Sequence, residues 1–298
     1  MSATTICSRG VTLVVSAALG AVMLSAGTAQ AQAIDPNPGA LTFTGAFDMP
    51  TLYMFRGIRQ ETDPGFTMWP AADLKIDLMS GDGTLKSAAI NLGLWNSLHT
   101  GSSGSGNDDT AVGMHYEEDF YASFTLGFGG ATSFTTQYTA YTSPNARFTT
   151  VKEVLFKVSQ GSRFAPYGLI AFEFDTEPGV GQADGGSEAG TYMELGVGPS
   201  WPLGGRSTVT IPFKLGFSLS DYYESPVDGE SNPFGFVDIG ALVTVPLSTV
   251  SSRFGSWNLH FGIDYFGLGE TTHSFNVDVD GETSPSKFVA LVGFGVTY

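Results

Sequence analysis

The sequence FVALVGFGVTY, residues Phe288–Tyr298, shows the alternation of a β-strand. Successive side chains of a strand point to opposite faces. One face therefore carries Phe288, Ala290, Val292, Phe294, Val296 and Tyr298, and the other carries Val289, Leu291, Gly293, Gly295 and Thr297. A strand with one apolar face and a terminal aromatic residue is typical of transmembrane β-barrels. We therefore compared the rest of the chain with this pattern.

The first 31 residues have the features of a secretory signal peptide. Arg9 precedes the apolar segment Val11–Leu24, and small residues ending in Ala29-Gln30-Ala31 follow it. This apolar segment is too short for a permanent transmembrane helix, which needs roughly 18 apolar residues, and no other segment offers them. We predict cleavage after Ala31, or after Ala33, and a single exported domain over residues 32–298. Cys7 is the one cysteine and would leave with the signal peptide, so we expect no disulfide or thiolate chemistry.

The composition agrees with a membrane barrel. Charged residues make up 14% of the chain and aromatic residues 13%, with 39 glycines. Soluble domains usually carry about 25% charged residues. In a membrane barrel every second residue faces lipid, which lowers the charged fraction without producing long apolar runs. The sequence thus favours an all-β, antiparallel transmembrane β-barrel of the bacterial outer membrane. A soluble exported β-sandwich is the alternative.

Twelve segments read as strands of about the length that crosses a membrane. They cover residues 41–52, 66–79, 84–98, 116–128, 131–142, 151–159, 165–175, 190–202, 207–219, 235–247, 256–268 and 287–298. The connections alternate between short turns and long loops, as in outer-membrane barrels, which have short periplasmic turns and an even number of strands. We therefore predict about 12 strands with both termini on the periplasmic side. The last strand should pair with Leu41–Asp48 and close the barrel.

A short segment of the first long loop resembles a known family. Residues 53–60 read Tyr-Met-Phe-Arg-Gly-Ile-Arg-Gln. This segment resembles the Tyr-x-x-Arg-Gly-Ile-x-Gln stretch of a group of uncharacterised Gram-negative outer-membrane proteins regarded as porins. The resemblance implies an outer-membrane barrel of unassigned cargo and brings no catalytic residues. Arg56, Gly57 and Arg59 form the core of the motif. The two arginines either close the first loop onto loop acids or select permeants.

Charge is distributed unevenly along the chain. With Arg9 removed, 12 basic residues face 29 acidic ones, a net charge of −17. The expected long loops hold most of the loop acids, namely Glu61, Asp63, Asp108, Asp109, Glu177, Asp184, Glu188, Asp221, Glu224, Asp228, Glu230, Glu270, Asp278, Asp280 and Glu282, against Arg56, Arg59 and Arg147. Such a rim concentrates cations and repels anions. Alternatively, these carboxylates bind divalent cations that outer-membrane lipid and lipopolysaccharide share. A surface this acidic gives no reason to expect a nucleic-acid partner.

Strand parity assigns a mixed set of charges to the barrel interior. The expected pore-lining residues are Asp73, Lys75, Asp77, Asp119, Glu153, Lys157, Glu194, Lys214, Asp238 and Asp264, accompanied by Asn91, Glu173, Asn258 and His260. Charges far from bulk water persist only if they are paired or hydrated. A twelve-stranded barrel lies between the filled eight-stranded type and the open channels of sixteen or more strands. A narrow or partly blocked interior is therefore expected.

Two functions fit this pattern. The first is a passive diffusion channel, narrow and cation-leaning, for small cationic or neutral solutes. The second is a barrel with a plugged interior whose long acidic loops bind partners. The oligomeric state is open, since lipid-facing and subunit-facing surfaces are both apolar. Trp201, Trp257 and Phe120 fall on lipid-facing parity near the strand ends, where an aromatic girdle is expected.

Catalysis and metal binding are not expected. A hydrolase site needs a serine, a histidine and an orienting Asp or Asn in contact. His99, His115 and His273 fall at or in long loops and His260 faces the interior, and there is no Gly-x-Ser-x-Gly motif. Residues 276–281 resemble the start of a calcium loop, but the twelfth position is Lys287 instead of the bidentate glutamate. The groups His99, His115, Asp108 and Asp109, and His273, Asp278 and Asp280, are the remaining metal candidates. No cofactor is expected.

Overall fold

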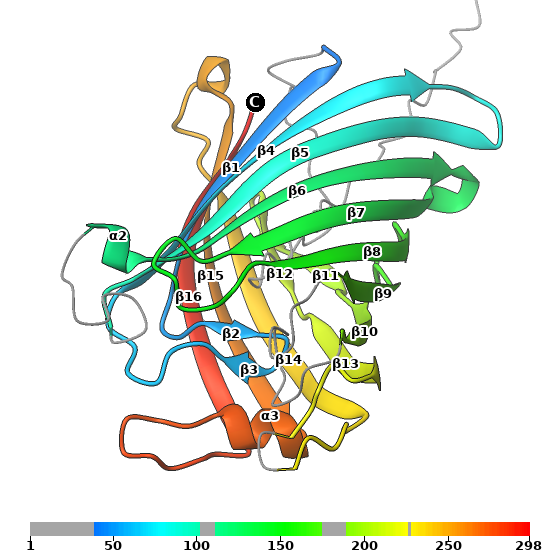
Figure 1. Cartoon of the computed structure of the whole chain (residues 1–298). Helices are drawn as coiled ribbons and strands as arrows, with labels where there is room; N and C mark the ends of the chain where they lie inside the picture. Colours follow the sequence, from blue (N-terminus) through cyan, green and yellow to red (C-terminus); the bar gives the residue numbers. More distant parts are fainter. Residues whose placement is uncertain (1–38, 102–110, 175–188, 226–227) are drawn as a thin grey trace, which may run out of the picture.

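The computed structural model describes residues 39–101, 111–174, 189–225 and 228–298, and within these the chain forms one antiparallel β-barrel (Figure 1). The predicted signal peptide lies outside the described residues. The strands of the barrel are β1 (Leu41–Pro50), β4 (Thr67–Ser80), β5 (Leu85–His99), β6 (His115–Phe128), β7 (Thr132–Thr142), β8 (Val151–Gln160), β9 (Tyr167–Phe174), β10 (Thr191–Val197), β11 (Ser200–Gly204), β12 (Ser207–Thr210), β13 (Phe213–Ser220), β14 (Phe234–Pro246), β15 (Ser256–Leu268) and β16 (Ser286–Thr297).

These fourteen segments form twelve membrane-crossing strands, as the sequence predicts. β10 and β11 are one strand interrupted at Gly198-Pro199, and β12 and β13 are one strand interrupted at Ile211-Pro212. A proline has no backbone N–H and so cannot donate to the ladder. The two interruptions face each other, because the N–H of Ile211 donates to the carbonyl of Pro199 at 3.0 Å. The sheet stays continuous across both of them.

The sheet closes between its first and last strands, as predicted. β1 pairs with β16 in a register that joins Thr44 to Thr297 and Asp48 to Gly293. Phe43 and Tyr298 exchange two backbone hydrogen bonds, of 2.7 and 2.8 Å. Closure leaves no sheet edge, and this satisfies the backbone groups that lipid cannot.

The outside of the barrel is apolar. In β16 the predicted lipid-facing residues Phe288, Val292, Phe294 and Tyr298 are exposed, whereas Val289 and Leu291 are buried inside. Phe120 on β6 is also exposed, while Trp201 and Trp257 are half-buried. Arg163 lies over the Trp201 ring at 5.1 Å, and the Trp257 indole N–H donates to the carbonyl of Phe254 at 2.8 Å. Their role in an aromatic girdle stays a prediction.

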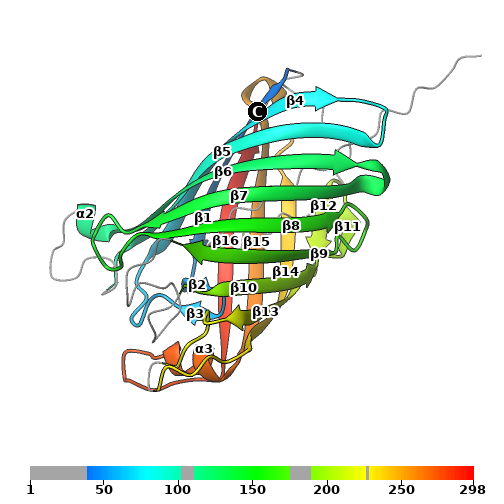
Figure 2. The same cartoon turned by 45° about the vertical axis from the view of Figure 1, so that its right-hand side comes forward.

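Short turns and long loops gather at opposite ends, which Figure 2 shows from a second direction. The short-turn end includes the 3-10 turns η1 (Gly129–Ala131) and η2 (Ser252–Phe254). The long-loop end carries the small helices α2 (Ala111–Met114) and α3 (Glu270–Phe275). Among the described residues no helix is long and apolar enough to cross a membrane. The compartment that each end faces stays a prediction.

Candidate functional site: the inward-folded first loop

The first long loop folds into the barrel instead of standing above it. It forms a hairpin of two short strands, β2 (Met54–Phe55) and β3 (Ile58–Arg59), which lies between opposite sides of the barrel in both views (Figures 1 and 2). Arg56 and Gly57 form its tip with φ of 46° and 81°. Positive φ at both central residues is the signature of a type I′ turn, which matches the twist of a two-residue hairpin. The Arg-Gly pair of the sequence motif is therefore a turn.

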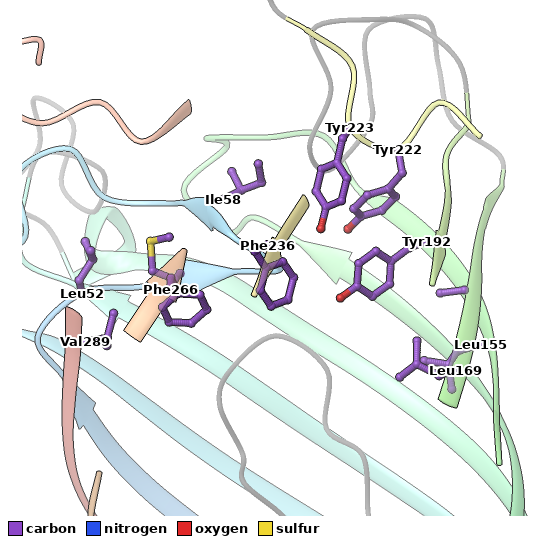
Figure 3. Packing of buried hydrophobic residues seen from close by; sticks show 12 residues of the cluster. Leu52, Ile58, Leu155, Leu169, Tyr192, Tyr222, Tyr223, Phe236, Phe266 and Val289 are labelled. Carbon is purple, nitrogen blue, oxygen red and sulfur yellow. The ribbon is translucent and has the colours of Figure 1, made fainter. Parts of the chain in front are cut away.

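Apolar side chains of the barrel pack on both faces of this hairpin. On one face, Leu52, Met54 and Ile58 join a cluster contributed by six barrel strands and the β13–β14 loop, namely Leu155, Leu169, Ala171, Tyr192, Tyr222, Tyr223, Phe236, Phe266 and Val289. Figure 3 shows Phe236 between the tyrosines and the Phe266 side of this cluster. On the other face, Tyr53 and Phe55 contact Trp69, Trp95, Tyr116, Tyr141, Val151 and Leu291. All of these side chains are buried, so the hairpin forms a packed core across the long-loop half of the barrel.

Arg56 anchors the tip of the hairpin to the barrel interior. Its Nη1 and Nη2 atoms donate to the two carboxylate oxygens of Glu153 on β8, at 2.7 and 2.9 Å. Nη1 also donates to the Tyr222 hydroxyl at 2.9 Å, and the guanidinium carbon lies 4.1 Å from the centre of the Tyr192 ring. Burial lowers the pKa of Arg56, but the Glu153 carboxylate together with Tyr222 and Tyr141 outweighs this effect, and the net pKa lies above its ordinary value. The guanidinium is therefore charged, buried and paired.

The β13–β14 loop and helix α3 contact the tip of the hairpin or support the residues that do. The Tyr223 hydroxyl donates to the carbonyl of Arg56 at 2.8 Å. Thr271 of α3 accepts a hydrogen bond from the Asn232 amide at 2.7 Å and donates to the carbonyl of Tyr223 at 3.4 Å. Gly57 is packed against Phe236, since a Cβ at Gly57 would lie 2.9 Å from the Phe236 Cβ. Two long loops and β14 thus hold the tip in place.

A second anchor lies at the base of the hairpin. The Glu61 carboxylate accepts from the backbone N–H of Tyr53 at 2.7 Å and from the Thr67 hydroxyl at 2.5 Å. The His99 ring lies 3.6 Å from the same carboxylate and stacks on Tyr116 with ring centres 4.4 Å apart. Burial raises the pKa of Glu61, and the hydrogen bonds from Thr67 and Tyr53 oppose that rise without cancelling it. Glu61 is therefore a buried structural carboxyl rather than a rim charge.

The sequence-predicted interior charges lie on the enclosed face of the strands, and several of them form local pairs. Lys214 pairs with Asp238 at 2.6 Å, and Lys75 pairs with Asp77 at 2.7 Å near the short-turn end. Glu194 accepts hydrogen bonds from Tyr167 and Tyr192 at 2.5 and 2.6 Å. The remaining members are buried, namely Asp73, Asp119, Glu153, Lys157 and Asp264. Whether these residues line a conducting pore stays a prediction.

The motif residues differ from their expected contacts. The sequence leaves two roles open for Arg56, closing the loop onto loop acids or selecting permeants, and in the structure it pairs with Glu153, which belongs to a strand of the barrel. Arg59 donates to the backbone carbonyls of Glu61 and Thr62, at 2.5 and 2.8 Å, and not to a carboxylate. No local sequence pattern indicates these contacts, because they form only when the loop turns inward. The buried tyrosines 192, 222 and 223 were likewise not singled out.

Among the described residues, one histidine contacts both a serine and a carboxylate: the His99 ring lies 2.6 Å from the Ser97 hydroxyl and 3.6 Å from Glu61, and all three side chains are fully buried. His99 is buried in the second anchor, and His260 pairs with Asp48 at 2.6 Å on the enclosed face. No group of three or more His, Cys, Asp or Glu side chains among the described residues could hold a metal ion. The Asp278 carboxylate accepts from the backbone N–H groups of Asp280 and Glu282, closing a turn. Asp108 and Asp109 lie outside the described residues, as do Glu177, Asp184 and Glu188.

Known proteins resemble this chain in overall architecture. No family model matches the sequence, and no curated protein matches it. The β-domain of the Bordetella autotransporter BrkA is 12% identical with a TM-score of 0.38, covering 87% of this chain and 99% of that one. The NanC porin is 10% identical with a TM-score of 0.38, covering 86% and 99%. The anion-selective porin from Comamonas acidovorans is 8% identical with a TM-score of 0.37, covering 87% and 98%.

The class of the protein follows from its own geometry. The sheet is closed, the outer face is largely apolar, and many charged side chains of the strands are enclosed. Closed antiparallel barrels of this kind cross membranes because every backbone group is paired within the sheet. The chain is therefore a closed, antiparallel β-barrel of the transmembrane type, with twelve strands.

Proposed function

We propose that this chain is a porin-like outer-membrane barrel that is closed in its ground state by the hairpin of its first loop. Small cationic or neutral solutes pass when the hairpin leaves the interior. The proposal includes no catalytic step and no cofactor. The hairpin thus combines the roles of plug and gate.

The observation that carries this proposal is the packing around the hairpin. Buried side chains of β4, β5, β6, β7, β8, β9, β10, β14, β15 and β16 form two hydrophobic clusters with it. Trp69, Trp95, Tyr141 and Leu155 are at most 1% exposed, as are Tyr192, Tyr222 and Tyr223. Close packing of this kind around the hairpin supports a blocked interior. Passage therefore requires displacement of the hairpin.

The charge of the interior supports a preference for cations. Buried carboxylates at Asp48, Asp73, Asp119, Glu153, Glu173, Asp238 and Asp264 outnumber the enclosed bases Arg56, Lys157 and Lys214. Once Arg56 leaves with the hairpin, the excess of negative charge grows. An enclosed negative field raises the local concentration of cations and repels anions.

A permanently plugged barrel is the second candidate. The same buried core favours it, because the hairpin is anchored at both its tip and its base. Such a barrel would act through its long acidic loops, by binding a partner or surface lipid. The two candidates differ in whether the hairpin can move.

A reversible tether distinguishes them. The tether is the double variant Gly57→Cys with Phe236→Cys. A Cβ at position 57 would lie 2.9 Å from the Phe236 Cβ. A disulfide needs a Cβ–Cβ distance of about 3.5–4.5 Å, so a small shift of the backbone allows it to form. In planar bilayers we expect the oxidised pair to remain silent and reduction to restore discrete conductance steps with a preference for potassium over chloride. Gly57→Cys alone is the matched control and should respond to neither treatment.

Two outcomes would reject the gated channel. If wild-type protein and the reduced pair are silent at saturating protein, the plugged barrel stands. If the oxidised pair conducts like the wild type, ions pass without movement of the hairpin. Reversal potentials that favour chloride would contradict the cation preference.

A further inference from the structure

The groups around the Arg56 guanidinium form a complete recognition site whose components belong almost entirely to the barrel. Glu153 comes from β8, Tyr192 from β10, and Tyr222 from the β13–β14 loop. The two carboxylate oxygens accept two hydrogen bonds, the Tyr222 hydroxyl accepts a third, and the Tyr192 ring covers one face of the guanidinium. Only Arg56 itself and the Phe55 ring, 5.0 Å away, belong to the hairpin.

We propose that Glu153, Tyr192 and Tyr222 form a binding site for small guanidinium cations, which Arg56 occupies while the barrel is closed. The hairpin then acts as an internal substitute for the solute. This inference rests on the proposed opening of the hairpin for access in the wild-type protein. It adds to that function the chemical class of the solute.

The site is held in shape by residues outside the hairpin. The Tyr141 hydroxyl donates to Glu153 at 3.2 Å and helps to fix the carboxylate. The hydroxyl of Tyr192 donates to Glu194 at 2.6 Å, and Glu194 accepts a further bond from Tyr167 at 2.5 Å. These contacts lie within and between neighbouring strands, so they remain when Arg56 leaves. A pre-formed site binds more tightly because little ordering is required.

The geometry selects guanidinium over other cations. A carboxylate that accepts two parallel N–H bonds matches the planar fork of a guanidinium, and an aromatic ring stacks on its face. An ammonium ion has no such plane and is more strongly hydrated. In the described part of the chain the Arg56 Nε has no hydrogen-bond partner. Glu153 and Tyr222 therefore bind the guanidinium through its other two nitrogens, Nη1 and Nη2. A free guanidinium can present any two of its three nitrogens to Glu153.

Competition between Arg56 and a solute would also open the barrel. Removal of Arg56 leaves Glu153 buried without its counter-ion, which strongly opposes opening. A guanidinium solute that binds there removes this penalty, and therefore shifts the equilibrium toward the open state. Binding of the solute at Glu153 would thus release the tip of the hairpin and open the barrel to that solute.

Chemical rescue tests the site directly in the full-length barrel. Arg56→Gly removes the guanidinium and suits the positive φ of 46° at this position. Calorimetric titration of this variant with methylguanidinium should give saturable heat, with an affinity at least about tenfold above that of methylammonium, a difference of about 1.4 kcal/mol. Wild-type protein at the same concentrations should bind more weakly, because Arg56 competes. The double variant Arg56→Gly with Glu153→Gln should show no saturable heat.

The outcomes separate this inference from the proposed function. Saturable binding to Arg56→Gly with silent wild-type bilayers would support the site and reject the gated channel. No saturable heat, equal binding of methylammonium, or unchanged binding to the double variant would overturn the site, whatever the bilayers show. If Arg56→Gly does not fold alone, methylguanidinium in the refolding buffer should restore the barrel. Failure to restore it, or equal restoration of the double variant, would also overturn the site.

Discussion

The Arg56–Glu153 ion pair joins a loop residue to a strand residue, and both side chains are buried. Strand parity placed Glu153 in the interior, and the motif marked Arg56 as a special loop residue. The two residues are 97 positions apart, and no local pattern joins positions at that distance. Only the inward fold of the loop brings them together. Pairings between a loop and a strand depend on tertiary packing, which periodicity does not report.

The buried ion pair leads to the first prediction. Glu153→Gln leaves the Arg56 guanidinium buried without its counter-ion, and such a loss costs about 3–5 kcal/mol. We expect faster hydrogen exchange over Tyr53–Gln60 and a lower Tm. The control is Lys75→Gln, which removes a half-exposed pair worth at most about 1 kcal/mol. Equal effects of the two substitutions would contradict the anchoring role of Arg56.

Glu61 leads to a prediction about pH. Burial raises its pKa in the folded protein above the unfolded value of about 4.3. The folded state therefore favours the protonated carboxyl, and this contribution to stability is present below the unfolded pKa and lost as the pH rises through the folded pKa. Glu61→Gln imitates the protonated form. We expect the Tm of wild type to fall relative to that of Glu61→Gln as the pH rises from the unfolded pKa of about 4.3 through the higher folded pKa. A relative rise would contradict the raised pKa.

At the scale of elements, the membrane strands could be predicted and the hairpin could not. The strands alternate over ten or more residues in most cases, which gives a clear period of two. β2 and β3 have two residues each, too few for any periodicity. The breaks before β11 and β13 also escaped prediction, although Pro199 and Pro212 mark both. Proline inside a strand pattern is the local signal that indicates such a break.

The tip of the hairpin leads to a prediction at this scale. Gly57→Ala places a Cβ 2.9 Å from Phe236 at a φ of +81°, so both packing and backbone conformation oppose it. A positive φ and overpacking each cost about 1–3 kcal/mol. Gly130→Ala is the matched control, because Gly130 has a φ of +71° and no atom within 4 Å of its Cβ position. We expect thermal unfolding to show the larger loss for Gly57→Ala, and similar losses would argue against tight packing at the tip.

At the scale of the molecule, twelve strands enclose a space that one hairpin and its neighbouring side chains can fill. A barrel of this size lies between filled and open types, which the strand count alone predicted. Which loop fills it was not predictable, because six long connections had similar polar compositions. The inward fold of the first loop depends on its apolar residues Leu52, Tyr53 and Phe55, which pack into the two buried clusters of the barrel.

Interior charge gives a prediction for the open barrel. Asp73 lies on the enclosed face, bonded to Asn91 and Tyr121 at 2.8 and 3.0 Å. In a variant without the hairpin, Asp73→Asn with Asp77→Asn should lower the potassium-to-chloride preference more than Glu282→Gln, because Glu282 lies in an exposed loop. Reversal potentials in a salt gradient measure this preference. Equal effects would place selection at the loops instead of the interior.

The most direct test of the closed ground state is the single-channel conductance of wild type against a variant in which residues 52–60 are replaced by two glycines. The buried core around the hairpin predicts that wild-type protein rests closed, with brief openings, while the variant is continuously open with large steps. A wild-type barrel that conducts as steadily as this variant would contradict the account.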